Sequence, residues 1–92
     1  MRPRLPWMTR GDDYILEFLR DKNIVASPHV IALNIDFSKQ YVNERIRILH
    51  AAGLVDRVQT GIYQITDLGT RYLDDDLTQN EKTELAKFRK DD

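Results

Sequence analysis

Cysteine is absent from this sequence of 92 residues. Without a thiol, the chain has no disulfide framework, no cysteine nucleophile and no cysteine-based metal site. This absence excludes the small disulfide-stapled folds of secreted proteins and fits a reducing compartment. Long apolar runs are absent as well, because no stretch approaches the roughly 20 apolar residues of a membrane-spanning helix. We therefore expect a cytoplasmic protein without a membrane partner.

The groups that catalysis or metal binding would need are also scarce. The two histidines, His29 and His50, have no cysteine nearby and are not four residues apart, so the sequence does not indicate a metal site. Asp12 and Asp13 are adjacent, and successive residues of a helix do not face one another as an acid and base pair would. There is no glycine-rich phosphate loop and no recognisable activated nucleophile. We expect a protein that is not an enzyme, with no catalytic residue, metal or cofactor.

The sequence lacks a large excess of either charge. It has 14 Lys and Arg and 15 Asp and Glu, which gives a net charge of −1. The distribution is uneven. Residues 1–73 hold ten basic and eight acidic side chains, whereas residues 74–92 hold four and seven. The first part is therefore mildly basic, which is a weak indication of a nucleic-acid partner. A chain of this length forms one domain with a thin core.

The first part of the sequence has the start and stop signals of two helices. Thr9 followed by Asp12 is a candidate capping box, which predicts a first helix over residues 10–22. The Asn-Ile-Val-Ala segment after it is long enough only for a bridge-like strand. Ser27 before a proline predicts the start of a second helix, because serine caps a helix and proline suits its first position. This helix is expected to stop near Asp36.

A third helix is predicted over residues 38–52, with Ser38 as its cap and Gly53 as the residue that ends it. Its apolar residues recur at i, i+4 and i+7, which predicts a buried stripe of Val42, Ile46 and Leu49. The opposite face carries charged and amide side chains. The second and third helices, joined by a short turn, have the arrangement of a helix-turn-helix.

Two short strand-like runs follow, separated by Thr60 and Gly61. A two-residue link that ends in glycine predicts a β-hairpin. In the simplest register, one face of the hairpin carries Val58, Tyr63 and Ile65, and the other carries Arg57, Gln59 and Gln64. Thr66 predicts the cap of a short helix over residues 67–73, and a fifth helix is expected over residues 77–90.

This order of elements is that of a winged helix-turn-helix. The fold class is therefore mainly α with a small β-hairpin (α-β-α-α-β-β-α) plus a C-terminal helix. We divide the chain into an N-terminal arm (1–8), a winged helix-turn-helix domain (9–73) and an acidic C-terminal helix and tail (74–92). In this fold the third helix lies in the major groove of DNA and its N-terminal residues read base edges.

The polar face of the third helix suits that role. Lys39 can reach a guanine edge or a phosphate, and Gln40 and Asn43 can each form two hydrogen bonds with adenine. Arg47 is better placed for backbone phosphates. Tyr41 has two alternative roles: a contact with a phosphate or a thymine methyl, or packing against the first helix.

Other groups flank this face. Free backbone N–H groups at the helix starts marked by Ser27 and Ser38 can receive phosphate oxygens. A short wing, residues 57–63, can touch an adjacent phosphate or the minor groove. Glu44 and Arg45 are interpreted as structural, although Glu44 can also read cytosine or pair with the arginine three residues on. The candidate DNA-contacting residues are Ser27, Ser38, Lys39, Gln40, Tyr41, Asn43, Arg47, Arg57, Gln59 and Thr60.

The stretch GLVDRVQTGIYQITDLGTRYL, residues 53–73, resembles the third-helix exit, wing and following helix of archaeal winged-helix regulators. Together with PWMTRGDDYILEFL and SKQYVNERI, it is similar to the phi-H-type phage repressor family of halophilic archaea. The resemblance covers about residues 6–77, although Asp36 stands where the turn commonly has glycine. It implies sequence-specific DNA binding and transcriptional regulation, and it places Ser38, Lys39, Gln40, Tyr41 and Arg47 on the recognition helix.

We expect double-stranded DNA as the partner, bound by a homodimer, because a lone small winged helix makes few contacts. The predicted dimer interface is an apolar stripe of the last helix, made of Leu77, Leu85 and Phe88. The same stripe can instead pack back on the first helix. The alternative function is a winged-helix protein–protein interaction module without DNA binding, which the near-neutral charge favours. RNA is a weaker alternative, because the hairpin offers only Tyr63 for base stacking.

Overall fold

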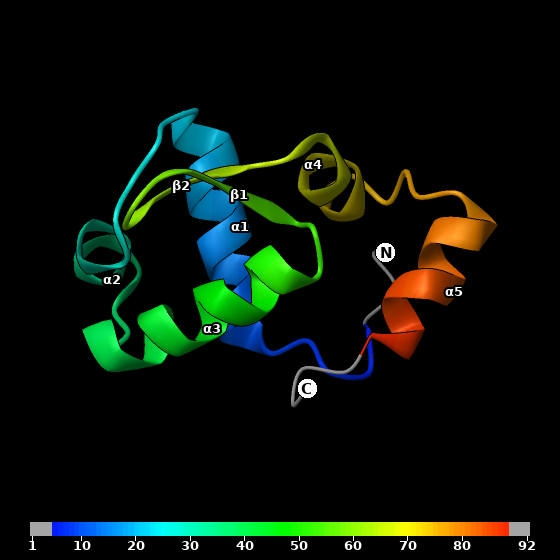
Figure 1. The fold of residues 1–92 in the computed structure, drawn as a ribbon, viewed down its shortest axis with the longest axis horizontal. Coiled ribbons are helices and arrows are strands. Elements are labelled where there is room, and N and C mark those ends of the chain that lie inside the picture. The colour runs from blue at the N-terminus through cyan, green and yellow to red at the C-terminus, as the bar shows by residue number, and fades with distance from the viewer. Residues whose placement is uncertain (1–4, 89–92) are drawn as a thin grey trace.

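The computed structural model describes residues 5–88, and Figure 1 shows how their elements are arranged. In chain order these are α1 (Arg10–Lys22), α2 (Pro28–Ile35), α3 (Lys39–Ala51), β1 (Val55–Gln59), β2 (Ile62–Ile65), α4 (Asp67–Leu73) and α5 (Gln79–Lys87). An isolated bridge also joins Ala26 to Tyr63, as the short segment before α2 predicted. The predicted winged helix-turn-helix with an added C-terminal helix is confirmed.

Local capping accounts for where the helices begin. The Thr9 hydroxyl accepts the Asp12 N–H, and the Asp12 carboxylate accepts the Thr9 N–H, which is the predicted capping box. The same hydrogen bond to the N–H three residues on starts α2, α3 and α4, from the side chains of Ser27, Ser38 and Thr66. Asp36 ends α2 in the left-handed conformation with φ 63°, and Gly53 follows α3 with φ 87°. The predicted starts of these helices are confirmed.

One apolar core lies between α1, α2, α3 and the base of the hairpin. Its side chains with no exposed surface are Ile15, Leu16, Leu19, Ile31, Val42, Ile46, Leu49 and Leu54. The predicted buried stripe of α3 is thus confirmed, and burying each such side chain contributes about 1.5–3 kcal/mol. Within residues 5–88, no helix is long and apolar enough to cross a membrane.

The register of the hairpin differs from the predicted one. The strands pair antiparallel, with Val55 opposite Ile65, Asp56 opposite Gln64, Arg57 opposite Tyr63 and Gln59 opposite Ile62. A bulge after Arg57 leaves Val58 unpaired and 46% exposed. The predicted faces are therefore wrong, because Arg57 rather than Val58 stands opposite Tyr63. Gly61 makes the turn with φ 77°, a conformation that favours glycine.

α4 closes against the base of the hairpin and against α1. Gly69 lies so near β2 and the segment before β1 that a Cβ atom on it would collide with the Leu54 carbonyl oxygen and the Ile65 side chain. Tyr72 is 1% exposed, and its hydroxyl donates to the Asp13 carboxylate on α1 at 2.9 Å. These contacts hold the wing at a fixed angle to the helices.

The C-terminal helix begins at Gln79, two residues later than predicted, because Thr78 and Glu81 form a capping box there. Residues 89 and 90 of the predicted helix lie outside the described residues, as do the first four residues of the predicted arm. Arg71 of α4 forms two hydrogen bonds with the Glu81 carboxylate. This guanidinium lowers the pKa of Glu81 to about 2. The ion pair between Arg71 of α4 and Glu81 of α5 therefore remains formed at acidic pH.

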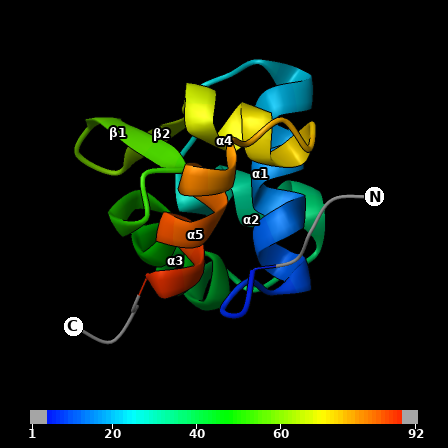
Figure 2. The same ribbon diagram turned by 90° about the vertical axis from the view of Figure 1, so that its right-hand side faces the viewer.

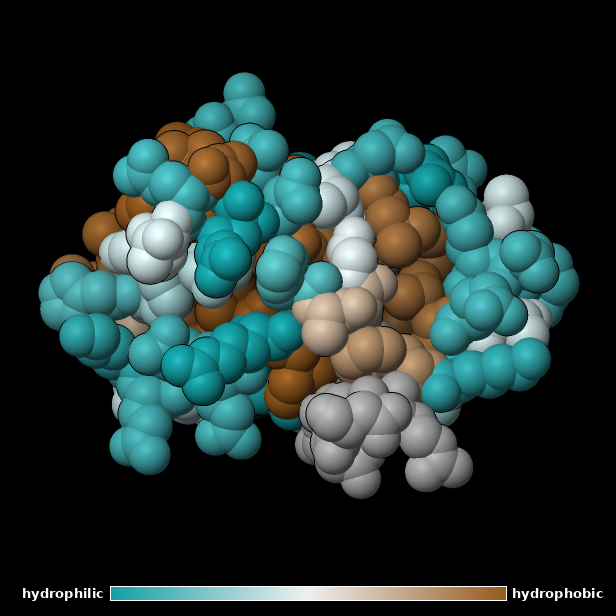
Figure 3. Space-filling model, viewed as in Figure 1, coloured by the Kyte–Doolittle hydropathy of each residue, from teal (hydrophilic) through white to brown (hydrophobic). Residues whose placement is uncertain are grey.

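Trp7 joins the N-terminal segment to α5. Its indole N–H donates to the Leu85 carbonyl oxygen at 2.8 Å, and its ring centroid lies 5.2 Å from that of Phe88. Leu85 is only 6% exposed, so this member of the predicted apolar stripe packs inside the chain, whereas Leu77 and Phe88 are half-buried. An apolar groove remains between α5 and the ends of α3 and α4, lined by Ala52 and Leu68 among others, and Figure 3 shows apolar surface there. The use of the stripe in a dimer stays a prediction.

Candidate nucleic-acid interface

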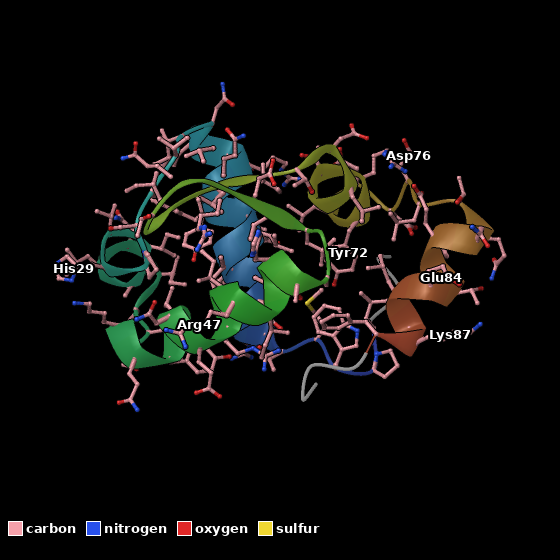
Figure 4. All side chains as sticks on the ribbon, in the orientation of Figure 1. His29, Arg47, Tyr72, Asp76, Glu84 and Lys87 are labelled. Carbon is pink, nitrogen blue, oxygen red and sulfur yellow. The ribbon has the colours of Figure 1, made fainter. Side chains whose placement is uncertain are left out.

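α3 presents a polar face directly opposite its buried stripe. A helix turns about 100° per residue, so Gln40, Glu44 and Arg47 follow one line on the outer side. All three side chains are exposed, as is Lys39 in the first turn, whereas Asn43 is half-buried at the edge of the face. Figure 4 labels Arg47 on this helix. The structure therefore brings four of the predicted DNA-contacting side chains together along α3.

The start of α3 adds backbone donors to this face. The Ser38 hydroxyl accepts the Tyr41 N–H at 3.0 Å, and the Ser38 carbonyl accepts the Val42 N–H at 3.0 Å. The N–H groups of Lys39 and Gln40, at the first two helical positions, point out of the helix end. Such groups, at the positive end of the helix dipole, suit a phosphate oxygen.

Tyr41 lies between α3 and α1. Its hydroxyl is 2.8 Å from the Thr9 hydroxyl, and its ring stacks on Phe37 with centroids 5.0 Å apart. Gly11 of α1 faces this ring, and a Cβ atom there would collide with it. Of the two roles open to Tyr41, the structure has the packing one. A DNA contact from this half-buried residue stays a prediction.

A buried ion pair fixes the inner face of α3 to α1. The Arg45 Nε and Nη2 groups donate to the two carboxylate oxygens of Asp12 at 2.8 and 2.6 Å. Arg45 is 4% exposed and Asp12 is 0% exposed. The hydrogen bond to Asp12 raises the pKa of Arg45 above its already high ordinary value, so the guanidinium stays charged. The predicted structural role of Arg45 is confirmed, but its partner was not apparent from the sequence.

Trp7 connects this ion pair to α5. The Trp7 carbonyl oxygen accepts the third hydrogen bond of the Arg45 side chain, from Nη2, at 3.1 Å. The Trp7 indole N–H donates to the Leu85 carbonyl oxygen. α3 and the C-terminal helix α5 therefore share one contact residue. Trp7 also packs against the core. Its two hydrogen bonds were not apparent from the sequence, in which it is a lone tryptophan two residues before the capping threonine.

The wing extends the polar surface. Arg57, Gln59 and Thr60 are all exposed, and Figure 2 shows the hairpin and α3 on the same side of the molecule. The His50 ring in the last turn of α3 meets the Tyr63 ring edge-on, with centroids 6.1 Å apart, which ties α3 to β2. Ser27 is half-buried at the start of α2, directly after the bridge that joins Ala26 to Tyr63 of β2. The α3 and wing residues thus form one surface, called the α3–wing face below. It consists of Lys39, Gln40, Asn43, Glu44 and Arg47 of α3 and Arg57, Gln59 and Thr60 of the wing.

Comparison with known proteins identifies the kind of chain that carries this face. The family model of the winged helix-turn-helix phage repressor matches residues 1–85. The chain is 34% identical over 82 residues to the repressor protein of Halobacterium phage phiH, a match that covers 85% of this chain and 92% of that protein. The crystal structure of the PhiH1 repressor-like protein from Haloarcula marismortui is similar with a TM-score of 0.73 and 34% identity, over 80% of this chain and 85% of that one. The resemblance stated from the sequence is confirmed, and the chain belongs to the winged helix-turn-helix phage repressor family.

Proposed function

We propose that this protein is a transcriptional repressor that binds double-stranded DNA sequence-specifically, with α3 in the major groove. The observation that carries the proposal is the division of α3 into two faces. One face is fully buried and tied to α1 by the ion pair of Arg45 and Asp12, so the helix is rigidly placed. The other face presents amide and charged groups of the kind that read base edges. Membership of a repressor family supports the same conclusion.

The proposed contacts follow from position along the α3–wing face. Lys39, Gln40 and Asn43 lie in the N-terminal half of α3, which is the half that meets base edges in this fold. Arg47 and the free N–H groups at the helix start contact phosphates, which position the protein without reading sequence. The wing residues Arg57, Gln59 and Thr60 contact the neighbouring backbone. We also propose that the protein acts by binding alone, without catalysis.

A fluorescence-anisotropy titration at several salt concentrations tests DNA binding. Duplex fragments from the protein's own upstream region are the probes, with unrelated duplex as competitor. Each phosphate that a cation neutralises contributes about −0.9 to the slope of log K against log salt. If Lys39, Arg47 and Arg57 each neutralise one phosphate, the slope is about −3 per protomer. Absence of binding to any duplex at low salt would favour a protein-interaction module instead.

We propose further that two copies bind together, each reading one half-site about one helical turn from the other. Leu77 and Phe88, together with the apolar groove beside α5, supply apolar surface for such an interface. Sedimentation velocity over a range of protein concentrations, with and without the bound duplex, measures the assembly. We expect a dimer on DNA. A single copy on a saturated specific site would contradict the proposal.

The division into an arm (1–8), a DNA-binding domain (9–73) and a C-terminal helix and tail (74–92) is kept as part of this proposal. The contact of Trp7 with Leu85 adds that the arm and the C-terminal helix pack on each other.

A further inference from the structure

Glu44 occupies the centre of the outward face of α3. It lies one turn after Gln40 and about one turn before Arg47, directly opposite the buried stripe, and it is exposed. In a helix that lies in the major groove, this side of the N-terminal half is nearest to the base edges. The side chain at this position therefore meets the DNA whatever its chemistry is.

No hydrogen-bond or ion-pair partner among residues 5–88 accounts for a carboxylate at this place. Among residues 5–88, Glu44 has neither a hydrogen bond nor an ion pair, so the pair with Arg47 that the sequence allowed is not formed. Two other carboxylates on helices are firmly engaged: Asp12 by Arg45 and Glu81 by Arg71. Within the described residues, the structural interpretation of Glu44 is therefore supported by no hydrogen bond or ion pair, and its charge acts only at a distance on the neighbouring Arg45.

A free carboxylate on this face is unfavourable for DNA binding in general. Duplex DNA carries one negative charge per roughly 1.7 Å of its axis. The cationic side chains of Lys39 and Arg47 on the same face are attracted to it, and Glu44 is repelled. The repulsion is compensated only where the groove offers a hydrogen-bond donor to the carboxylate.

Cytosine is the base whose major-groove edge offers such a donor and no acceptor. Guanine presents two acceptors, adenine presents an acceptor beside its amino group, and thymine presents an acceptor and a methyl group. We propose that Glu44 is a specificity-determining residue that accepts a hydrogen bond from the amino group of one cytosine in each half-site. The same charge disfavours other bases there. The inference rests on the proposed function, because it requires α3 to lie in the major groove.

The test compares the wild-type protein with Glu44→Gln and with a control, Asp76→Asn. Each variant selects binding sites from a randomised duplex library, and the selected duplexes are then titrated by anisotropy. Asp76 is exposed between α4 and α5, where Figure 4 labels it, so the control also removes one carboxylate charge, but away from the α3–wing face and from the groove beside α5. Both substituted side chains lie on the surface, so circular dichroism should show unchanged folding.

Wild type and Asp76→Asn are expected to select duplexes with a fixed cytosine in each half-site. Replacing that C·G pair should weaken wild-type binding by roughly 5- to 150-fold. Glu44→Gln should lose this preference or shift it to adenine, which an amide side chain pairs in bidentate fashion. It should also bind unrelated duplexes more tightly than wild type does.

Two other results would overturn the inference, and they differ from each other. If Glu44→Gln selects the wild-type sequence and binds all duplexes tighter by one common factor, Glu44 merely repels phosphates, and the proposed function still stands. If the wild-type protein selects no sequence at all, the proposed function is wrong, and so is the proposed hydrogen bond from cytosine to Glu44.

Discussion

Replacing Arg45 with methionine is expected to lower the free energy of unfolding by about 3–5 kcal/mol. The substitution leaves the Asp12 carboxylate, which has no exposed surface, without its counter-ion. It also removes the hydrogen bond to the Trp7 carbonyl oxygen. A small domain has about 5–15 kcal/mol of stability in total, so the loss is a large fraction. Urea unfolding followed by circular dichroism measures it.

Arg20→Met is the matched control for this experiment. Arg20 also pairs with a carboxylate, that of Asp74, but both side chains are partly exposed, and such surface pairs are worth about 0–1 kcal/mol. A double variant with Asp12→Asn and Arg45→Met should regain part of the loss, because no charge is then buried alone and the asparagine oxygen can still accept the Thr9 N–H of the capping box. If Arg45→Met is no more destabilising than Arg20→Met, the ion pair does not hold α3 on α1.

Replacing Lys39 and Gln40 together with alanine is expected to reduce operator affinity to the level of unrelated DNA. A good base contact contributes roughly 1–3 kcal/mol of discrimination, so losing both contacts weakens specific binding by about 100-fold or more. Both side chains are exposed, and stability should change by less than about 0.5 kcal/mol per substitution. Anisotropy titrations on the selected operator and on unrelated duplex measure the two affinities.

A control with the same two residue types exists away from the α3–wing face, where Lys22 at the end of α1 and Gln79 at the start of α5 are exposed. Alanine at both of these positions removes one amide and one positive charge without touching the α3–wing face, and operator affinity should stay near that of wild type. A folded Lys39 and Gln40 double variant that still binds its operator as tightly as wild type would show that α3 does not read the bases.

The elements of this fold could be predicted because their signals are local. Thr9, Ser27, Ser38 and Thr66 each accept an N–H only three residues on, and such bonds are readable from spacing alone. The buried stripe of α3 follows equally from a repeat along one helix. The order of elements, the helix-turn-helix and the outward set of Lys39, Gln40 and Arg47 were therefore determined by the sequence.

The hairpin shows where local reasoning ends. A two-residue turn fits several registers, and the bulge that exposes Val58 changes which residues stand opposite each other without changing the turn. The register also depends on how the strands pack against α4. Gly69 has no side chain there and so leaves room for the carbonyl oxygen of Leu54. No pattern within the strands encodes that contact.

The interactions that hold the recognition helix were decided only by the tertiary structure. Arg45 meets Asp12 across 33 positions of the chain, and Trp7 meets Leu85 across 78. The sequence contains many carboxylates that are equally eligible as partners of an arginine, and only the folded core selects one and removes it from water. The same holds for Glu44, whose lack of a hydrogen-bond or ion-pair partner within residues 5–88 follows from where neighbouring helices place their charges. Sequence spacing determines which face a side chain occupies, whereas the packing of distant elements determines what it meets there.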